Sequence, residues 1–254
     1  MILLLLFINT AYANTFFSYG MNSEEIVPSG FNILYSPINL SADIRFFNNS
    51  YNQIYIHTDG YITLSNSSYS GLVEYPHKDS IAIVPYWSLI DTTYNGIISY
   101  REIIHRYKLL YFSKKVQQAF KKYQNFTATY GFIVTWFDVP KYNSSQEERN
   151  TFQLVFLSND ATSFVLFNYY EMQWTRFLYS YDTSVIKDYK QVYYSIYNEA
   201  KNLQKQSNVN LTGLWVFRVD GKYSAIKIKN IKNSTYFLKY SLLNLILCMM
   251  FNKI

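Results

Sequence analysis

The sequence predicts a mainly β protein, with sandwich-like antiparallel sheets and one or two helical insertions. Short runs rich in Tyr, Phe, Ile, Val and Thr alternate with Asn, Asp, Gly and Ser, which is typical of strands and turns. The dipeptides Asp59-Gly60 and Asn95-Gly96 stand between such runs and favour tight turns. Strands and helices do not alternate regularly, so a parallel βαβ architecture is not indicated.

The first predicted strands surround the Asp59-Gly60 turn. Residues 54–58 and 61–64 form a hairpin there, because Asp-Gly readily adopts the positive φ angles of a two-residue turn. Residues 81–87 form an apolar run typical of a buried strand, and Pro85 must lie at a strand end or edge because it has no N–H group. Two further strands follow at 97–101 and 129–136.

The clearest predicted hairpin pairs residues 151–158 with residues 163–169. The four residues between them make a loop of typical hairpin length. A last strand at 214–219 closes the domain. Alternation along it places three apolar side chains on one face: Trp215, Phe217 and Val219.

Two segments have helical patterns. Residues 114–123 carry apolar side chains at the spacing i, i+3, i+4, i+7, and Ser113 stands where an N-cap is expected. The four apolar residues are Val116, Ala119, Phe120 and Tyr123. Four lysines fall on the other side, which favours a solvated helix face over a site for an anionic surface. The second, weaker candidate is 193–206.

The positive charge of the chain is concentrated at its C-terminal end. The 254 residues include 23 Lys and Arg, 17 Asp and Glu, and one Cys. Six of the basic residues and no acidic residue lie in 222–254, so the preceding 221 residues are neutral. Nucleic-acid binding is therefore not expected. A single Cys also excludes an internal disulfide and a multi-cysteine metal site.

Both ends of the chain differ from the body. Residues 1–13 combine an apolar run with the Ala11-Tyr12-Ala13 pattern of a signal peptide, and a buried N-terminal strand is the alternative. Residues 221–254 form a basic and apolar tail whose apolar run, 240–251, is too short to span a bilayer. We interpret this tail as a truncated or mis-spliced end. We expect the protein to attach to a membrane only if this tail serves as a membrane anchor.

A secreted chain should also carry N-glycans. The N-x-S/T acceptor pattern occurs seven times. The candidate residues are Asn39, Asn48, Asn66, Asn125, Asn143, Asn210 and Asn233.

The sequence offers little catalytic chemistry. It has no G-x-S-x-G, H-E-x-x-H, P-loop or G-x-G-x-x-G motif, and its three His residues, 57, 77 and 105, lack ligand spacing. The acidic pairs Glu24-Glu25 and Glu147-Glu148 could act as the two carboxylates of a glycosidase. Both pairs lie in polar, loop-like sequence, however, which favours carboxylates that are simply exposed to solvent. Asp91 suits a turn better than a calcium site. We therefore expect no enzyme activity, no cofactor and no metal. A lectin-like domain stays an alternative, because exposed aromatic side chains can stack on sugar rings.

Taken in order, the strand motifs resemble the NIDO domain, the extracellular domain of nidogen (entactin), alpha-tectorin and mucin-4. The resemblance covers residues 16–220, so we expect one NIDO-like domain over residues 14–220. The positions that carry it are Asp59, Gly60, Pro85, Trp87, Asp91, Trp136, Asn150, Thr151, Phe152, Gln153, Phe167, Tyr169, Trp174, Gly213 and Trp215. One departure is Leu89, where the family commonly has an acid.

The resemblance implies a secreted protein of the extracellular matrix or cell surface that takes part in cell–matrix adhesion. Its partners would be matrix or cell-surface proteins, with glycans as another class, and binding would be non-covalent. Two alternatives stay open: a secreted carbohydrate-binding domain, and a glycosidase with paired carboxylates.

Overall fold

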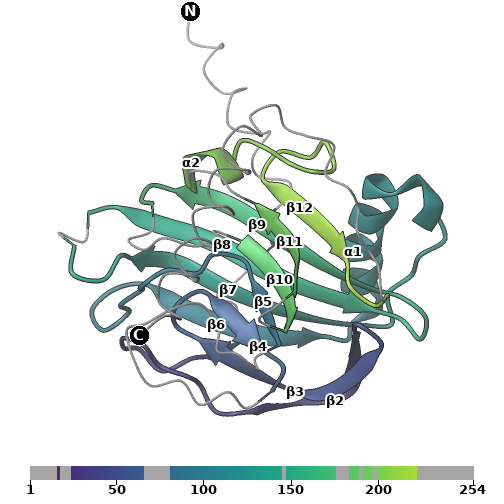
Figure 1. The fold of residues 1–254 in the computed structure, drawn as a ribbon, viewed down its shortest axis with the longest axis horizontal. Helices are drawn as coiled ribbons and strands as arrows, with labels where there is room; N and C mark the ends of the chain where they lie inside the picture. The colour runs from purple at the N-terminus through teal and green to yellow at the C-terminus, as the bar shows by residue number, and fades with distance from the viewer. Residues whose placement is uncertain are drawn as a thin grey trace, which may run out of the picture.

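Two antiparallel six-stranded sheets pack face to face in the computed structural model (Figure 1). The structure describes residues 16–17, 24–65, 81–144, 147–175, 183–188, 191–196 and 200–221, with the backbone alone for 183–188, 191–196 and 200–201. The two antiparallel sheets confirm the predicted fold class, a mainly β sandwich. The signal peptide, the tail, Asn66, His77 and Asn233 lie outside these residues.

The first sheet has the strand order β1-β6-β7-β8-β9-β12. Its strands are β1 (Glu25–Ile26), β6 (Ile97–Ile103), β7 (Tyr130–Pro140), β8 (Arg149–Ser158), β9 (Ser163–Met172) and β12 (Leu214–Arg218). The second sheet has the order β11-β10-β5-β4-β3-β2. Its strands are β2 (Ile38–Phe46), β3 (Asn49–His57), β4 (Tyr61–Thr63), β5 (Ala82–Val84), β10 (Thr183–Asp188) and β11 (Gln191–Ile196).

The predicted strands and turns are present. The loop between β3 and β4 contains Asp59-Gly60 as predicted, but it has three residues, 58–60, instead of two, because His57 pairs with Tyr61. Within this loop Gly60 alone has positive φ. The β8–β9 hairpin closes with Ser158 opposite Ser163. Pro85 directly follows β5, as its missing N–H group requires. On β12 and just beyond it, the three side chains predicted to share a face all lie in the core between the sheets.

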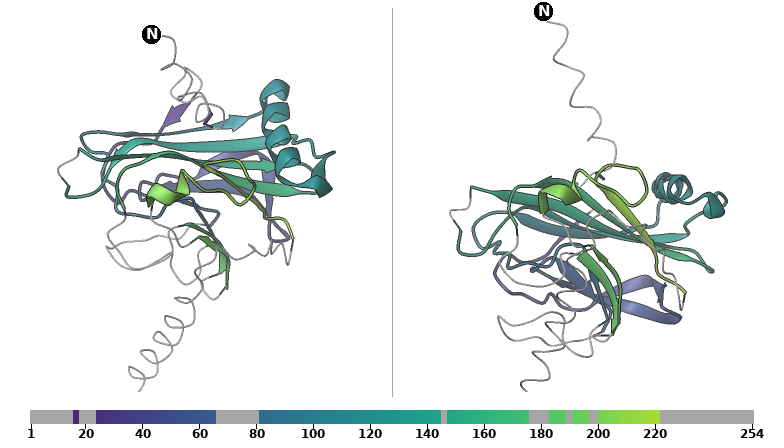
Figure 2. Two further views of the ribbon diagram at one scale, coloured as in Figure 1. Left: turned by 90° about the horizontal axis from the view of Figure 1, so that it is seen from above. Right: turned by 45° about the horizontal axis from the view of Figure 1, so that its top comes forward.

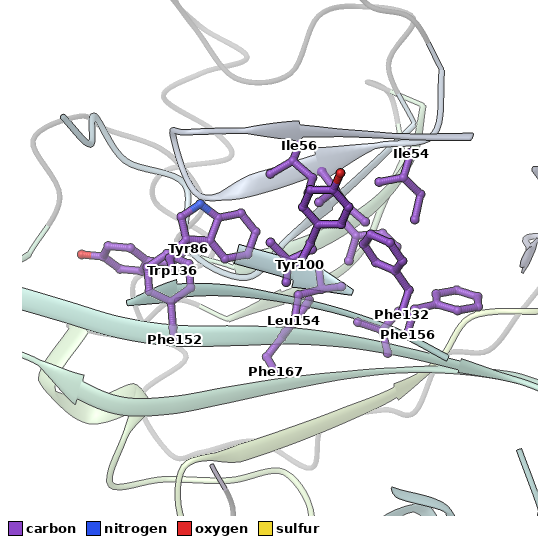
Figure 3. Close-up of a cluster of buried hydrophobic side chains, with 14 of the residues drawn as sticks. Ile54, Ile56, Tyr86, Tyr100, Phe132, Trp136, Phe152, Leu154, Phe156 and Phe167 are labelled. Carbon is purple, nitrogen blue, oxygen red and sulfur yellow. The ribbon is translucent and has the colours of Figure 1, made fainter. Parts of the chain in front are cut away.

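That core consists of aromatic and branched side chains from the two facing surfaces (Figure 3). Ile54 and Ile56 on β3 point toward Leu154 and Phe156 on β8, and all four are fully buried. Each such side chain contributes about 1.5–3 kcal/mol when it leaves water. An aromatic core of this size allows the domain to fold without disulfides.

A second core lies on the opposite face of the first sheet. The helix α1 (Arg106–Ala119) packs there, away from the second sheet (Figure 2). Its buried side chains Leu109, Phe112 and Val116 recur every three or four residues, so one face of the helix covers the sheet. The short 3-10 helix η1 (Lys121–Tyr123) follows.

The predicted start of this helix was wrong. The helix begins at Arg106, and Ser113 is in its interior instead of at its N-cap. The Ser113 hydroxyl donates to the carbonyl of Leu109 at 2.6 Å and accepts from the Ala128 N–H at 2.9 Å. Serine satisfied in this way is compatible with a helix interior. The helix also ends at Ala119, so Phe120 and Tyr123 lie beyond it.

The second predicted helix was mostly wrong. Residues 193–196 belong to β11, and the helical part is only α2 (Ala200–Leu203). The β-branched and aromatic residues of Gln191–Ile196 favour a strand once a partner strand is available. No helix in the described ranges is long and apolar enough to cross a membrane.

Replacing Gly60 with Ala should strongly destabilise the fold. Gly60 has φ +85°, and a Cβ atom there would lie 1.9 Å from the carbonyl oxygen of Tyr86. We expect a loss of about 3–5 kcal/mol in the free energy of unfolding, measured by urea denaturation.

Gly30→Ala is the matched control. Gly30 also has positive φ, but a Cβ there meets only the flexible end of the Ile33 side chain. We expect a clearly smaller loss for this variant, and equal losses would contradict the proposed backbone clash.

Candidate binding surface

Most motif positions gather at one end of the sandwich, where they are buried. Trp136 on β7 lies opposite Phe152 on β8, and Phe152 lies opposite Tyr169 on β9. The Asp59-Gly60 turn and the segment after β5 reach the same end. Thirteen of the fifteen positions are buried, and only Trp87 and Asp91 are partly exposed. These residues therefore build the fold and do not present a binding site.

Asn150, Trp174 and Tyr86 form a hydrogen-bonded clamp across this end. The carbonyl of Trp174 accepts from the Tyr86 hydroxyl at 3.1 Å and from the Asn150 side-chain amide at 3.0 Å. The Asn150 carbonyl oxygen accepts from the Trp174 N–H at 3.1 Å and the Gln173 N–H at 2.8 Å. Tyr86 follows β5 in the second sheet, whereas Asn150 is on β8 in the first sheet, so the clamp joins the sheets.

Further contacts between the sheets involve other motif positions. The Tyr169 hydroxyl donates to the Pro85 carbonyl at 2.6 Å, and the Trp136 indole N–H donates to the His57 carbonyl at 3.3 Å. Each bond joins a side chain of the first sheet to a backbone carbonyl of the second sheet or of the segment after it, in the buried space between them.

Gln153 holds the beginning of the described chain. Its side-chain amide accepts from the Phe17 N–H at 3.0 Å and donates to the Phe17 carbonyl at 2.9 Å. The Phe17 ring packs on Phe112 of α1, with centroids 4.0 Å apart. Gln153 therefore fixes this segment over the outer face of the first sheet.

The acidic residues considered above for catalysis or metal binding do not form a catalytic pair in the described structure: three of them bind neighbouring groups, and the other two are exposed to solvent. Glu24 forms an ion pair with Arg101 at 3.1 Å and accepts from Ser99, and Glu25 accepts from the Tyr100 hydroxyl. Asp91 accepts from the Thr93 N–H at 2.9 Å, which supports its predicted role in a turn. Glu147 and Glu148 are both exposed.

Metal binding has no support in the described ranges. There, no three His, Cys, Asp or Glu side chains lie close enough together to hold a metal ion.

The solvent-facing side of α1 differs from the rest of the described surface. Among the residues that the structure describes, nine large hydrophobic residues are exposed, and four of them lie within residues 104–111. Tyr107 is 68% exposed and Tyr111 43% exposed, one helical turn apart. We define the α1 surface as Ile104, Tyr107, Lys108, Leu110, Tyr111, Lys114 and Lys115.

Lysine side chains flank the tyrosine rings of the α1 surface. The Lys108 ammonium lies 5.9 Å from the centroid of the Tyr107 ring, and the Lys115 ammonium lies 5.4 Å from the Tyr111 ring. Such cation–π contacts hold both groups in place. Lys115 is half-buried, and burial lowers the pKa of its ammonium. Lys114 is exposed.

Sequence reasoning missed most of the α1 surface because it placed the helix start too late. With Ser113 taken as a cap, Tyr107 and Tyr111 fell outside the helix, and only Lys114 and Lys115 were recognised. The usable signal was the spacing of Leu109, Phe112 and Val116, which continues the apolar stripe one turn before Ser113.

The sequence matches the nidogen-like domain over residues 52–221. The chain belongs to the NIDO domain family. It is 32% identical to human (Homo sapiens) alpha-tectorin over 206 residues, 74% of this chain and 10% of that protein. It is 26% identical to nidogen-2 of Mus musculus over 263 aligned residues, 90% of this chain and 19% of that protein. No solved structure gives a significant match.

Membership of the NIDO family places this domain outside the cell, because nidogens and alpha-tectorin are secreted extracellular matrix proteins. These relatives are structural proteins, not enzymes. The chain spans only about a tenth to a fifth of their lengths. Two of the positions that carry the resemblance, Asn150 and Trp174, belong to the inter-sheet clamp, and most of the others are buried in the scaffold.

The glycosylation candidates are suitably placed for an extracellular domain. Every candidate asparagine in the described residues is exposed: Asn39, Asn48, Asn125, Asn143 and Asn210. Glycosylation of these residues stays a prediction.

Two titratable groups are buried at the turn of the NIDO scaffold. Burial raises the pKa of the Asp59 carboxyl to about 7, partly offset by the hydrogen bond from the Ile90 N–H. Burial lowers the pKa of His57 to about 3. The neutral His57 ring stacks on Tyr61 with centroids 3.9 Å apart. The two shifts act oppositely on stability as the pH changes.

Asp59→Asn should stabilise the domain at high pH. Because the folded-state pKa of Asp59 is raised, its stabilising contribution is complete below about pH 4 and is lost as the pH rises through about 7. The advantage of the variant in free energy of unfolding should therefore grow by about 2 kcal/mol between pH 5 and pH 8.

Urea denaturation of both proteins across this pH range measures the effect. The buried His57 also makes the stability pH-dependent: its contribution is complete above about pH 6.5 and is lost as the pH falls toward 3. Both proteins contain His57, so this contribution cancels when their free energies of unfolding are subtracted. A difference independent of pH would show that Asp59 is ionised in the folded protein.

Proposed function

We propose that this NIDO domain is an adhesion module, which binds matrix or cell-surface partners non-covalently through the α1 surface. The proposal is supported by the extracellular placement of the family and by the exposed aromatic residues of α1. Four exposed apolar side chains close together, rimmed by lysines, are typical of an interaction site.

The α1 surface is also well supported from beneath. Leu109, Phe112 and Val116 anchor the helix on the first sheet, and Phe17 packs on the same helix. A rigid helix loses little conformational entropy when a partner binds to it, which favours affinity. Tyrosine suits such surfaces because it offers a large contact area with only two rotatable bonds.

Replacing both exposed tyrosines tests the proposal. We expect Tyr107→Ala/Tyr111→Ala to weaken binding of the secreted full chain to immobilised reconstituted basement-membrane extract by about tenfold or more. Biolayer interferometry measures the binding, and thermal unfolding verifies that the variant is folded.

Tyr94→Ala provides the matched control, because Tyr94 is 79% exposed but lies on the loop before β6. This control should bind like the unmodified protein. If the double variant binds normally, or if Tyr94→Ala weakens binding equally, the α1 surface is not the adhesion site.

A further inference from the structure

Charge is segregated on this domain, although residues 1–221 are neutral as a whole. Residues 103–137 contain six lysine or arginine residues and no Asp or Glu. The remainder of residues 1–221 carries 11 basic and 17 acidic residues. All six basic residues belong to α1 and η1. Arg106, Lys114, Lys121 and Lys122 are exposed, and Lys108 and Lys115 are half-buried.

We propose that the α1 surface, together with Lys121 and Lys122, binds a sulfated polysaccharide chain of the extracellular matrix. This inference rests on the proposed adhesion function and names the chemical class of the ligand. Clustered lysines attract a polyanion by releasing its counterions, and basic clusters of this length are typical of heparin-binding patches.

The spacing along the helix fits a linear, repeating anion. Residues seven apart differ by about 10 Å along the axis and face nearly the same direction. Tyr107 and Lys114 are related in this way, as are Lys108 and Lys115. The helix therefore presents two parallel rows. The Tyr107 ring lies beside the Lys108 ammonium of the other row, and the Tyr111 ring, which belongs to neither row, lies beside the Lys115 ammonium. Sulfate groups can pair with the lysines while sugar rings stack on the tyrosines.

Two carboxylates of the described residues, Glu102 and Asp220, have partners of their own. The Asp220 carboxylate accepts two hydrogen bonds from the Arg218 guanidinium, both at 2.8 Å. Glu102 accepts from the Ser41 N–H and hydroxyl. Both acids thus accept hydrogen bonds from groups other than the lysines of α1 and η1.

A sulfated glycan fits better than an anionic membrane. Anionic lipids are concentrated in the cytoplasmic leaflet, whereas the NIDO domain is extracellular. Neutral-headgroup membranes would offer the lysines no counter-charge. An acidic protein offers charge but not the regular repeat that the two rows match.

Binding to heparin, measured by isothermal titration calorimetry with the secreted full chain at about 0.1 M salt, tests the inference. We expect heparin to bind and unsulfated hyaluronan to bind at least about tenfold more weakly. Lys114→Gln/Lys121→Gln should weaken heparin binding about tenfold, and its affinity should depend less steeply on salt because fewer counterions are released.

The matched control is Lys141→Gln/Lys205→Gln, which also removes two positive charges. Lys141 directly follows β7 and Lys205 lies just after α2, at the end of the sandwich away from α1. Its heparin affinity should stay within about twofold of the original. No heparin binding, equal binding of hyaluronan, or equal effects of the two lysine pairs would overturn the inference. So would a preference for phosphatidylserine vesicles or polyglutamate over heparin.

These failures can be separated from failure of the adhesion proposal. If basement-membrane extract still binds through Tyr107 and Tyr111 while heparin does not bind, adhesion stands and the sulfated ligand is wrong. If heparin binding depends on the lysines but matrix binding ignores the tyrosines, the ligand class stands and the proposed adhesion site is wrong.

Discussion

The carbonyl group of Trp174 is the point on which the two sheets of this domain depend. It accepts one hydrogen bond from Tyr86, which follows β5 of the second sheet, and another from Asn150 on β8 of the first sheet. Apolar contacts between sheets are strong but have little directional preference, so they alone do not fix how the sheets are placed. The buried hydrogen bonds supply that direction, because a shift of either sheet would leave polar groups unpaired in the core.

This arrangement separates the scaffold from the surface that we propose for binding. The clamp and its neighbouring motif positions occupy one end of the sandwich, whereas α1 covers the outer face of the first sheet at the other end (Figures 1 and 2). Substitutions on the solvent side of α1 therefore leave the clamp intact. In our proposal, the clamp residues hold the fold constant, while the charged and aromatic side chains of the α1 surface determine which ligand binds.

Local patterns predicted the strands well where one face is apolar and a turn signal adjoins it, as at Asp59-Gly60 and at the β8–β9 hairpin. They missed β2, whose Ser, Asp and Arg side chains are largely exposed and give no apolar face. Its hairpin with β3 turns at Phe47-Asn48, where both residues have positive φ, and this dipeptide is a weaker turn signal than Asn-Gly or Asp-Gly. The start of α1 was missed because Ser113 finds its partners, Leu109 and Ala128, only in the folded chain. The sequence motifs located the scaffold, but the exposed face of α1 could be recognised only once the helix bounds were known.

A double-mutant cycle between Tyr86→Phe and Asn150→Ala tests the role of the Trp174 carbonyl most directly. Each substitution removes one donor to the same oxygen atom, so the second should cost more once the first has been made. Asn150→Ala also removes the acceptor of the Trp174 and Gln173 N–H groups, and that loss is the same with or without Tyr86 and cancels in the cycle. We predict a coupling energy of about 1 kcal/mol or more in the free energy of unfolding by urea. Strictly additive losses would contradict the account, because the two sheets would then not be joined through this carbonyl group.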